Sequence, residues 1–135
     1  MSRSGYSDDC EGNGIELYRQ AVHRAIHGKR GQKLLLELAA AMDAMPEKKL
    51  ITEELVTADG ACCTLGVICK ARGITELPDA YDAESVGMRL GIARSMAAEI
   101  AYENDEFFRH ETPEQRWTRM RAWVAENLRQ EKVSP

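Results

Sequence analysis

Residues 112–128 read Thr-Pro-Glu-Gln-Arg-Trp-Thr-Arg-Met-Arg-Ala-Trp-Val-Ala-Glu-Asn-Leu, and this stretch decides the fold class. Thr112 is a good N-cap, Pro113 suits the first helical position, and Gln115 stands three residues after the cap, as in a capping box. Apolar side chains then recur at three- and four-residue steps along one face: Trp117, Met120, Val124 and Leu128. This periodicity predicts a long amphipathic helix near the end of the chain.

The same helical periodicity extends through the rest of the chain. The predicted helices cover residues 14–27, 32–45, 61–73, 82–88 and 91–103. We expect the first two to form an antiparallel hairpin joined by a basic turn over residues 28–31. The third helix is apolar nearly all round and contains Gly66, which costs about 1 kcal/mol relative to alanine in a helix interior. We therefore expect a neighbouring element to pack closely against Gly66.

Together these segments predict a mainly α protein, a compact single-domain bundle of about five to six helices. The predicted domain is residues 14–131, and residues 1–13, rich in Ser, Gly, Asp and Asn, are expected to form a flexible N-terminal tail. Residues 47–60 fit either a short helix or a short strand pair near 50–60. A length of 135 residues, with 44% hydrophobic and 30% charged side chains, suits one globular core.

Composition also limits where we expect the protein to work. The apolar runs are far shorter than the roughly 20 residues of a membrane-spanning helix, and the first ten residues have no apolar segment typical of a secretory signal. Cys62, Cys63 and Cys69 fall in one predicted helix at spacings that do not suit a disulfide, which indicates reduced, buried thiols. We therefore expect a cytoplasmic protein that does not contact a membrane.

Acidic residues are unevenly distributed, although the formal net charge is only −4. Residues 47–108 hold twelve acidic and six basic residues. Because the chain lacks the broad positive surface that phosphate neutralisation requires, we do not expect direct nucleic-acid binding. Two carboxylate clusters either form a solvated face or imitate a phosphate backbone and bind a basic groove of another protein. These clusters are Glu76, Asp79, Asp82 and Glu84, and Glu99, Glu103, Asp105 and Glu106.

The last predicted helix carries a second stripe beside its apolar face, formed by Arg116, Arg119 and Trp123. Arginine and tryptophan are enriched at the hot spots of protein interfaces, so this stripe is a second candidate for partner binding. The same pattern also fits a tryptophan that is half-buried against the preceding helix.

Two features have a weaker chemical signal. Lys29 and Arg30, in the predicted turn at residues 28–31, are placed to hold a phosphate or carboxylate at a helix start, but the spacing of a phosphate-binding loop is missing. Cys62 or Cys63 at a helix start would have a lowered pKa, as a nucleophile needs, but the apolar surroundings argue against exposure. A basic turn and buried thiols are the simpler interpretations.

His23 and His27 have a spacing at which two imidazoles can share a metal ion. Position 24 is Arg rather than the Glu of a metalloprotease helix, and the adjacent Cys62 and Cys63 lack the two-residue gap of a zinc knuckle. We therefore predict no catalytic residue, no metal and no cofactor.

Five stretches of the chain carry a resemblance: 1–10 (MSRSGYSDDC), 25–32 (AIHGKRGQ), 45–51 (MPEKKLI), 102–106 (YENDE) and 111–117 (ETPEQRW). Together they resemble a family of small uncharacterised proteins encoded by bacteriophages and prophages. The resemblance implies an accessory factor of a mobile element, working in the cytoplasm of a bacterial host cell. Because antagonists of bacterial defence are prominent among such factors, it adds one specific expectation, an inhibitor of a defence system such as a CRISPR effector.

The expected function is therefore binding of a host protein or protein complex through the carboxylate clusters or the arginine and tryptophan stripe. One alternative is a small-ligand protein or an enzyme that uses residues 28–31 and the helix start at Cys62 and Cys63. Another is a structural module that forms a homodimer or larger oligomer through exposed apolar helix faces.

Overall fold

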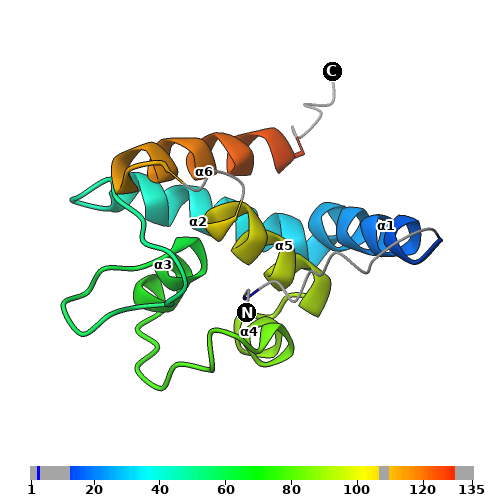
Figure 1. Ribbon diagram of the computed structural model, residues 1–135, viewed down its shortest axis with the longest axis horizontal. Helices are drawn as coiled ribbons and strands as arrows, with labels where there is room; N and C mark the ends of the chain where they lie inside the picture. The colour runs from blue at the N-terminus through cyan, green and yellow to red at the C-terminus, as the bar shows by residue number, and fades with distance from the viewer. Residues whose placement is uncertain (1–2, 4–12, 107–109, 130–135) are drawn as a thin grey trace.

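A computed structural model describes Arg3, residues 13–106 and residues 110–129 (Figure 1). This part of the chain contains six helices: α1 Asn13–His27, α2 Lys29–Ala44, α3 Thr64–Ala71, α4 Ala83–Leu90, α5 Arg94–Asp105 and α6 Pro113–Asn127. The prediction of a mainly α helical bundle is confirmed. Of the strand pair considered near 50–60, the described residues contain one isolated antiparallel bridge between Val56 and Cys62.

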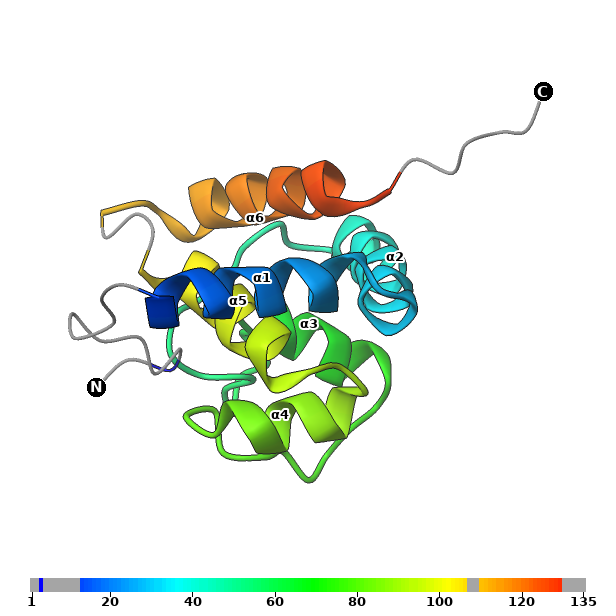
Figure 2. The ribbon, with the colours of Figure 1, turned by 90° about the vertical axis from the view of Figure 1, so that its right-hand side faces the viewer.

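Helix α5 lies at the centre of the bundle, where it contacts α1, α3, α4 and α6, while α2 contacts α1, α3 and α6 (Figure 2). The apolar stripes of these helices meet in one core. Its largest fully buried side chains include Leu34, Leu35, Leu38, Met42, Ile68, Val86, Met96, Ile100, Met120 and Val124. Removing such side chains from water, at roughly 25 cal/mol per Å² of apolar surface, is the main stabilising contribution to the fold.

The predicted antiparallel hairpin of the first two helices is wrong. Gly28 alone separates α1 from α2, and its amide still donates to the Arg24 carbonyl oxygen at 2.9 Å. Because one residue cannot reverse the chain, α2 turns away from α1, and Figure 2 shows α1 from the side and α2 nearly end-on. Gly31 is required at this corner, since a Cβ there would lie 2.1 Å from the Ala25 carbonyl oxygen.

The close approach expected at Gly66 is confirmed. A Cβ at this position would lie 1.8 Å from the Leu55 carbonyl oxygen, which accepts a hydrogen bond from the Cys63 amide at 3.1 Å. Helix α3 begins at Thr64 rather than at residue 61, because Cys63 is its N-cap and the Cys63 Sγ accepts from the Gly66 amide at 3.4 Å. Cys62 therefore precedes the helix start instead of forming it.

Side-chain caps define the starts of two other helices. At α6 the capping box is present: the Gln115 amide donates to Thr112 Oγ1 at 3.1 Å, and the Thr112 amide donates to Gln115 Oε1 at 2.8 Å. At α4 the Asp82 carboxylate accepts from the Ser85 amide at 3.1 Å. These local signals explain why both helix starts are correctly predicted from sequence.

Gln32 joins the ends of three helices. Its side-chain amide donates to the carbonyl oxygens of Ile26 in α1 and Asn127 in α6, at 2.8 and 2.9 Å. Its side-chain oxygen accepts from the Arg129 amide at 2.7 Å. One residue of the first turn of α2 thus fixes the corner where α1 ends and the point where α6 ends.

Candidate partner-binding surface

The first carboxylate cluster lies on the loop before α4 and on α4 itself. Glu76, Asp79, Asp82 and Glu84 are all exposed, and they take part in none of the ion pairs found among the described residues. Two of them have local roles, since Asp79 accepts from the Tyr81 amide at 2.9 Å and Asp82 caps α4. The hydrogen bonds from Ser85 hold the pKa of Asp82 below its ordinary value. All four carboxylates are therefore open to solvent along one stretch of chain.

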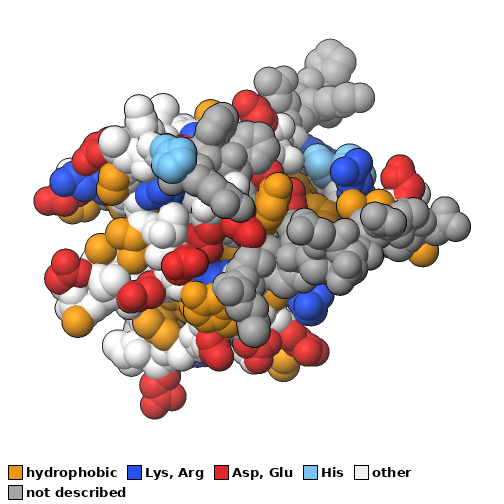
Figure 3. All heavy atoms as spheres, viewed as in Figure 1, with side chains coloured by type: hydrophobic (Ala, Val, Ile, Leu, Met, Phe, Trp, Pro, Cys, Tyr) orange, Lys and Arg blue, Asp and Glu red, His pale blue; other side chains and the backbone are white. Residues whose placement is uncertain are grey.

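Large apolar side chains are exposed in the same stretch. Met88 is 79% exposed, Tyr81 47% and Leu77 38%. Figure 3 shows carboxylates and hydrophobic side chains side by side along the edge where α4 and its preceding loop lie. Large apolar side chains that stay exposed among charged groups are typical of protein interaction sites. We call this set the α4 surface: Glu76, Leu77, Asp79, Tyr81, Asp82, Glu84 and Met88.

The second carboxylate cluster does not form a surface. Asp105 has a side chain only 6% exposed and forms a two-point ion pair with Arg3, at 2.6 and 2.7 Å. Glu103 is half-buried, with a carboxylate oxygen 3.9 Å from a nitrogen of Arg119, and burial raises its pKa. Glu99 and Glu106 are also half-buried. The structure therefore places Asp105 inside the fold, where it cannot meet a partner without losing Arg3.

The arginines of the predicted α6 stripe are engaged inside the protein. Arg116 is 7% exposed, donates to the Leu50 carbonyl oxygen at 2.9 Å and lies 3.3 Å from the Glu111 carboxylate. Arg119 makes a two-point contact with Glu111, at 2.9 and 2.5 Å. Trp123 packs half-buried against the core. Of the two interpretations of this stripe, the structure favours packing, and Glu111 is a partner that no sequence pattern singled out.

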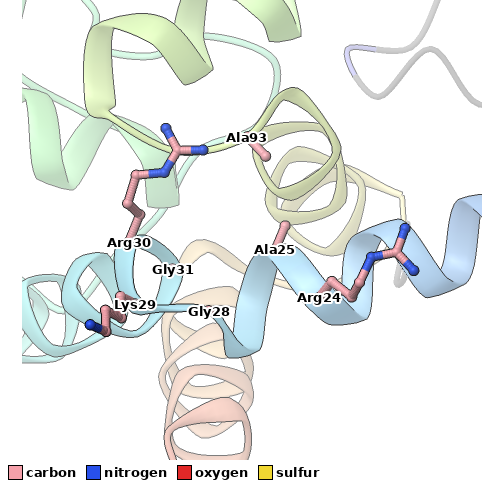
Figure 4. A pocket seen from close by; sticks show the side chains of 7 residues that line it. All are labelled: Arg24, Ala25, Gly28, Lys29, Arg30, Gly31 and Ala93. Carbon is pink, nitrogen blue, oxygen red and sulfur yellow. The ribbon is translucent and has the colours of Figure 1, made fainter.

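Lys29 and Arg30 lie in the first turn of α2 rather than in a turn between helices. With Arg24, Ala93 and the backbone around Gly28 they line a cavity of about 260 Å³ (Figure 4). Gly28 gives α2 no side-chain cap, and the N-terminus of a helix favours an anion. Figure 4 shows, however, that the charged ends diverge: Arg30 extends toward the segment of Ala93, and Lys29 and Arg24 point away on opposite sides. The three cations do not converge on one ligand position.

The described cysteines, Cys62, Cys63 and Cys69, are buried free thiols. Burial raises the pKa of Cys62 and of Cys69 to about 11, so both stay protonated at neutral pH. The sulfur of Cys63 lies 3.2 Å from a guanidinium nitrogen of Arg3. Nothing in the sequence pattern indicates Arg3, because an isolated arginine in a polar segment has no periodic neighbours.

The described residues were compared with the geometry of metal sites and of membrane-spanning helices in the part of the chain that the structure places: residues 3, 13–106 and 110–129. No group of three or more His, Cys, Asp or Glu side chains there is placed to hold a metal ion. The rings of His23 and His27 lie 4.2 Å apart between centroids. None of the described helices has the length and apolar character needed to cross a bilayer.

Comparison of the chain with protein-family models, with curated proteins and with solved structures found no match. The functional interpretation therefore depends on the residues themselves. The described residues form a small helical bundle, and carboxylates and apolar side chains are exposed together on α4 and the loop before it.

Proposed function

We propose that this protein acts by binding another protein and that the α4 surface makes the contact. The observation that carries this proposal is the exposure of Met88, Tyr81 and Leu77 among four carboxylates without ion-pair partners in the described chain. Elsewhere several acids are each matched to an arginine, as Glu37 is to Arg72 at 2.7 Å. On the α4 surface, exposed carboxylates and exposed apolar side chains occur together.

The α4 surface would suit a partner protein with lysines or arginines around an apolar depression. Fully burying a methionine side chain contributes about 1.5–3 kcal/mol, so Met88 is the expected anchor. Its unbranched thioether adapts to irregular pockets. The surrounding carboxylates would mainly accelerate association and fix orientation, because charged rims affect the association rate more than the final affinity.

The resemblance to phage and prophage proteins suggests the setting of this contact. In that setting the protein is an accessory factor in the cytoplasm of a bacterial host, and its partner is a host protein or complex. A defence complex such as a CRISPR effector has the basic nucleic-acid-binding grooves that an acidic surface would fit. The surface supports contact with a basic protein, and the resemblance alone supports the choice of a defence complex.

The proposal can be tested by affinity capture from a bacterial host, using wild type, Met88→Asp and the matched control Leu36→Asp. Leu36 is 59% exposed on α2, outside the α4 surface, so both variants place a charge at an exposed apolar position. We expect wild type and Leu36→Asp to retain a stoichiometric basic partner that dissociates as salt rises, and Met88→Asp to bind it at least tenfold more weakly. Circular dichroism would confirm that both variants fold.

Two outcomes would contradict the proposal. One is capture of no stoichiometric partner at low salt, and the other is equal binding of a purified partner by wild type and Met88→Asp. Light scattering of the purified protein tests the alternative that the chain forms a homodimer or larger oligomer. A mass that doubles with concentration, and that Met88→Asp returns to that of a monomer, would assign the α4 surface to a second copy of the chain.

A further inference from the structure

Arg3 lies outside all six helices, yet its side chain is completely buried. Its Nε donates to Asp105 Oδ2 at 2.6 Å and one terminal nitrogen donates to Asp105 Oδ1 at 2.7 Å. The other terminal nitrogen lies 3.2 Å from the Cys63 Sγ. Every nitrogen of the guanidinium therefore has an acceptor. Burial by itself lowers the pKa of Arg3, but Cys63 and Asp105 together raise it above its ordinary value.

The pocket around this guanidinium is built by parts of the fold other than Arg3. The Asp105 carboxylate accepts from the Asn104 side chain at 2.8 Å and from the Glu53 amide at 3.1 Å. Glu53 has φ of +67°, a backbone conformation that residues with side chains rarely adopt and that often marks a functional position. These contacts orient the carboxylate independently of what it binds.

Asn104 is held just as firmly. It is 1% exposed, and its oxygen accepts from the Thr64 hydroxyl at 2.7 Å and the Thr64 amide at 3.1 Å. Its nitrogen also donates to the Ile51 carbonyl oxygen at 2.9 Å. Three segments, 51–53, 63–64 and 104–105, are thus tied together behind the Asp105 carboxylate. The pocket is preorganised for a planar cation that contacts both carboxylate oxygens.

An empty pocket would leave the Asp105 carboxylate buried without a counter-charge, which is strongly unfavourable. Lysine is a poor substitute, because its ammonium is a point charge and cannot form the parallel two-point contact of a guanidinium. Arg3 lies outside the six described helices, and the contacts described for its side chain are those with Asp105 and Cys63. The ligand chemistry of the pocket is therefore that of an arginine side chain.

We propose that the pocket formed by Asp105, Cys63 and the Glu53 backbone is an arginine-binding site, which Arg3 fills in cis and which an arginine of another protein fills by displacing Arg3. This site is separate from the α4 surface and does not depend on the function proposed for it. Its occupant in trans is an arginine side chain presented by a partner protein. The competition makes Arg3 a built-in inhibitor of that second contact.

The test is to remove the cis ligand and supply the side chain in solution. The probe is N-acetyl-arginine amide, with N-acetyl-lysine amide as the matched control, and the readout is the thermal unfolding midpoint. Arg3→Ala is expected to unfold at a lower temperature than wild type. The arginine probe should then raise its midpoint saturably, by about 5 °C at ten times its Kd, whereas the lysine probe should have no effect. Wild type, already filled by Arg3, should respond little.

Two further variants keep the proposal open to refutation. The double variant Arg3→Ala/Asp105→Asn should lose the response to the arginine probe, because the carboxylate that binds the guanidinium has been removed. If Arg3→Ala does not fold, the arginine probe should restore its helical signal, and Arg3→Lys should show a smaller saturable rise. The proposal is overturned if the probe changes neither single variant, if the lysine probe acts equally, or if the double variant responds as strongly as Arg3→Ala.

Discussion

Replacing Gly66 with alanine would test how the 51–63 segment packs on α3. The new Cβ would lie 1.8 Å from the Leu55 carbonyl oxygen, 2.7 Å from its carbonyl carbon and 2.9 Å from the Cys62 Cβ. Since ordinary contacts of a Cβ are 3.4–4 Å, the Leu55 backbone must move by about 1.5 Å or α3 must tilt away. Either shift weakens the hydrogen bond from the Cys63 amide to the Leu55 carbonyl.

The cost of Gly66→Ala can be estimated from opposing contributions. Alanine gains about 1 kcal/mol over glycine in a helix interior. Overpacking typically costs 1–3 kcal/mol, and here the obstacle is backbone rather than a flexible side-chain end, so the upper part of that range or more applies. Loss of the hydrogen bond adds about 1 kcal/mol. We expect a net loss of about 3 kcal/mol, which lowers the unfolding midpoint by about 10 °C.

Urea denaturation followed by the helical circular dichroism signal would measure this loss. Ala40→Gly, at an exposed position of α2, is the matched control, because it changes one methyl group without touching another element and should cost only about 1 kcal/mol. The packing described for Gly66 is refuted if Gly66→Ala is as stable as wild type, or more stable, with an unchanged slope against urea.

Three other substitutions probe the ion pairs and the core. Glu111→Gln should cost about 3 kcal/mol in urea denaturation, because it leaves Arg119 largely buried without its two-point partner; a loss below 1 kcal/mol would mean that the pair is effectively solvated. Glu37→Gln should cost only about 0.5 kcal/mol at pH 7, since the pair with Arg72 is about one-third exposed. The hydrogen bond from Arg72 lowers the pKa of Glu37 in the folded state. The stability difference between wild type and Glu37→Gln should therefore persist above about pH 5 and disappear as the pH falls through the lowered pKa. A stability difference that grows in acid would contradict the ion pair with Arg72. Leu38→Ala, at a fully buried position, should cost 2–5 kcal/mol in the same denaturation experiment, and a loss under 1 kcal/mol would place it outside the core.

The helices could be predicted from the sequence because their signals are local. The cap at Thr112 and the apolar steps that follow it lie within one segment, and α6 begins at Pro113, directly after the predicted cap. The direction in which α2 leaves α1 could not be predicted in the same way. It depends on how closely Gly31 approaches the Ala25 carbonyl, a contact between two helices that no periodicity describes.

The candidate site residues also depend on contacts between distant segments, which the sequence pattern does not predict. Asp79 and Asp105 look equivalent in sequence, as acids within carboxylate clusters, yet Asp79 is exposed and Asp105 is buried against Arg3. Burial of a charge is decided by a partner from elsewhere in the chain, here more than 100 residues away. Arg116 differs from its solvated neighbours for a similar reason, since it donates to the Leu50 carbonyl oxygen, 66 residues away in the chain.

The clamp at Gln32 has a consequence for how the molecule opens. A terminal turn ordinarily frays on its own, and its amide hydrogens exchange with solvent almost freely. Here the Arg129 amide is held by a side chain at the junction of α1 and α2, so its protection from exchange should rise and fall with that distant corner. Local unfolding of the end of α6 would then occur together with opening of the corner between α1 and α2. The rate at which a protease cleaves near Arg129 would therefore measure the stability of that corner.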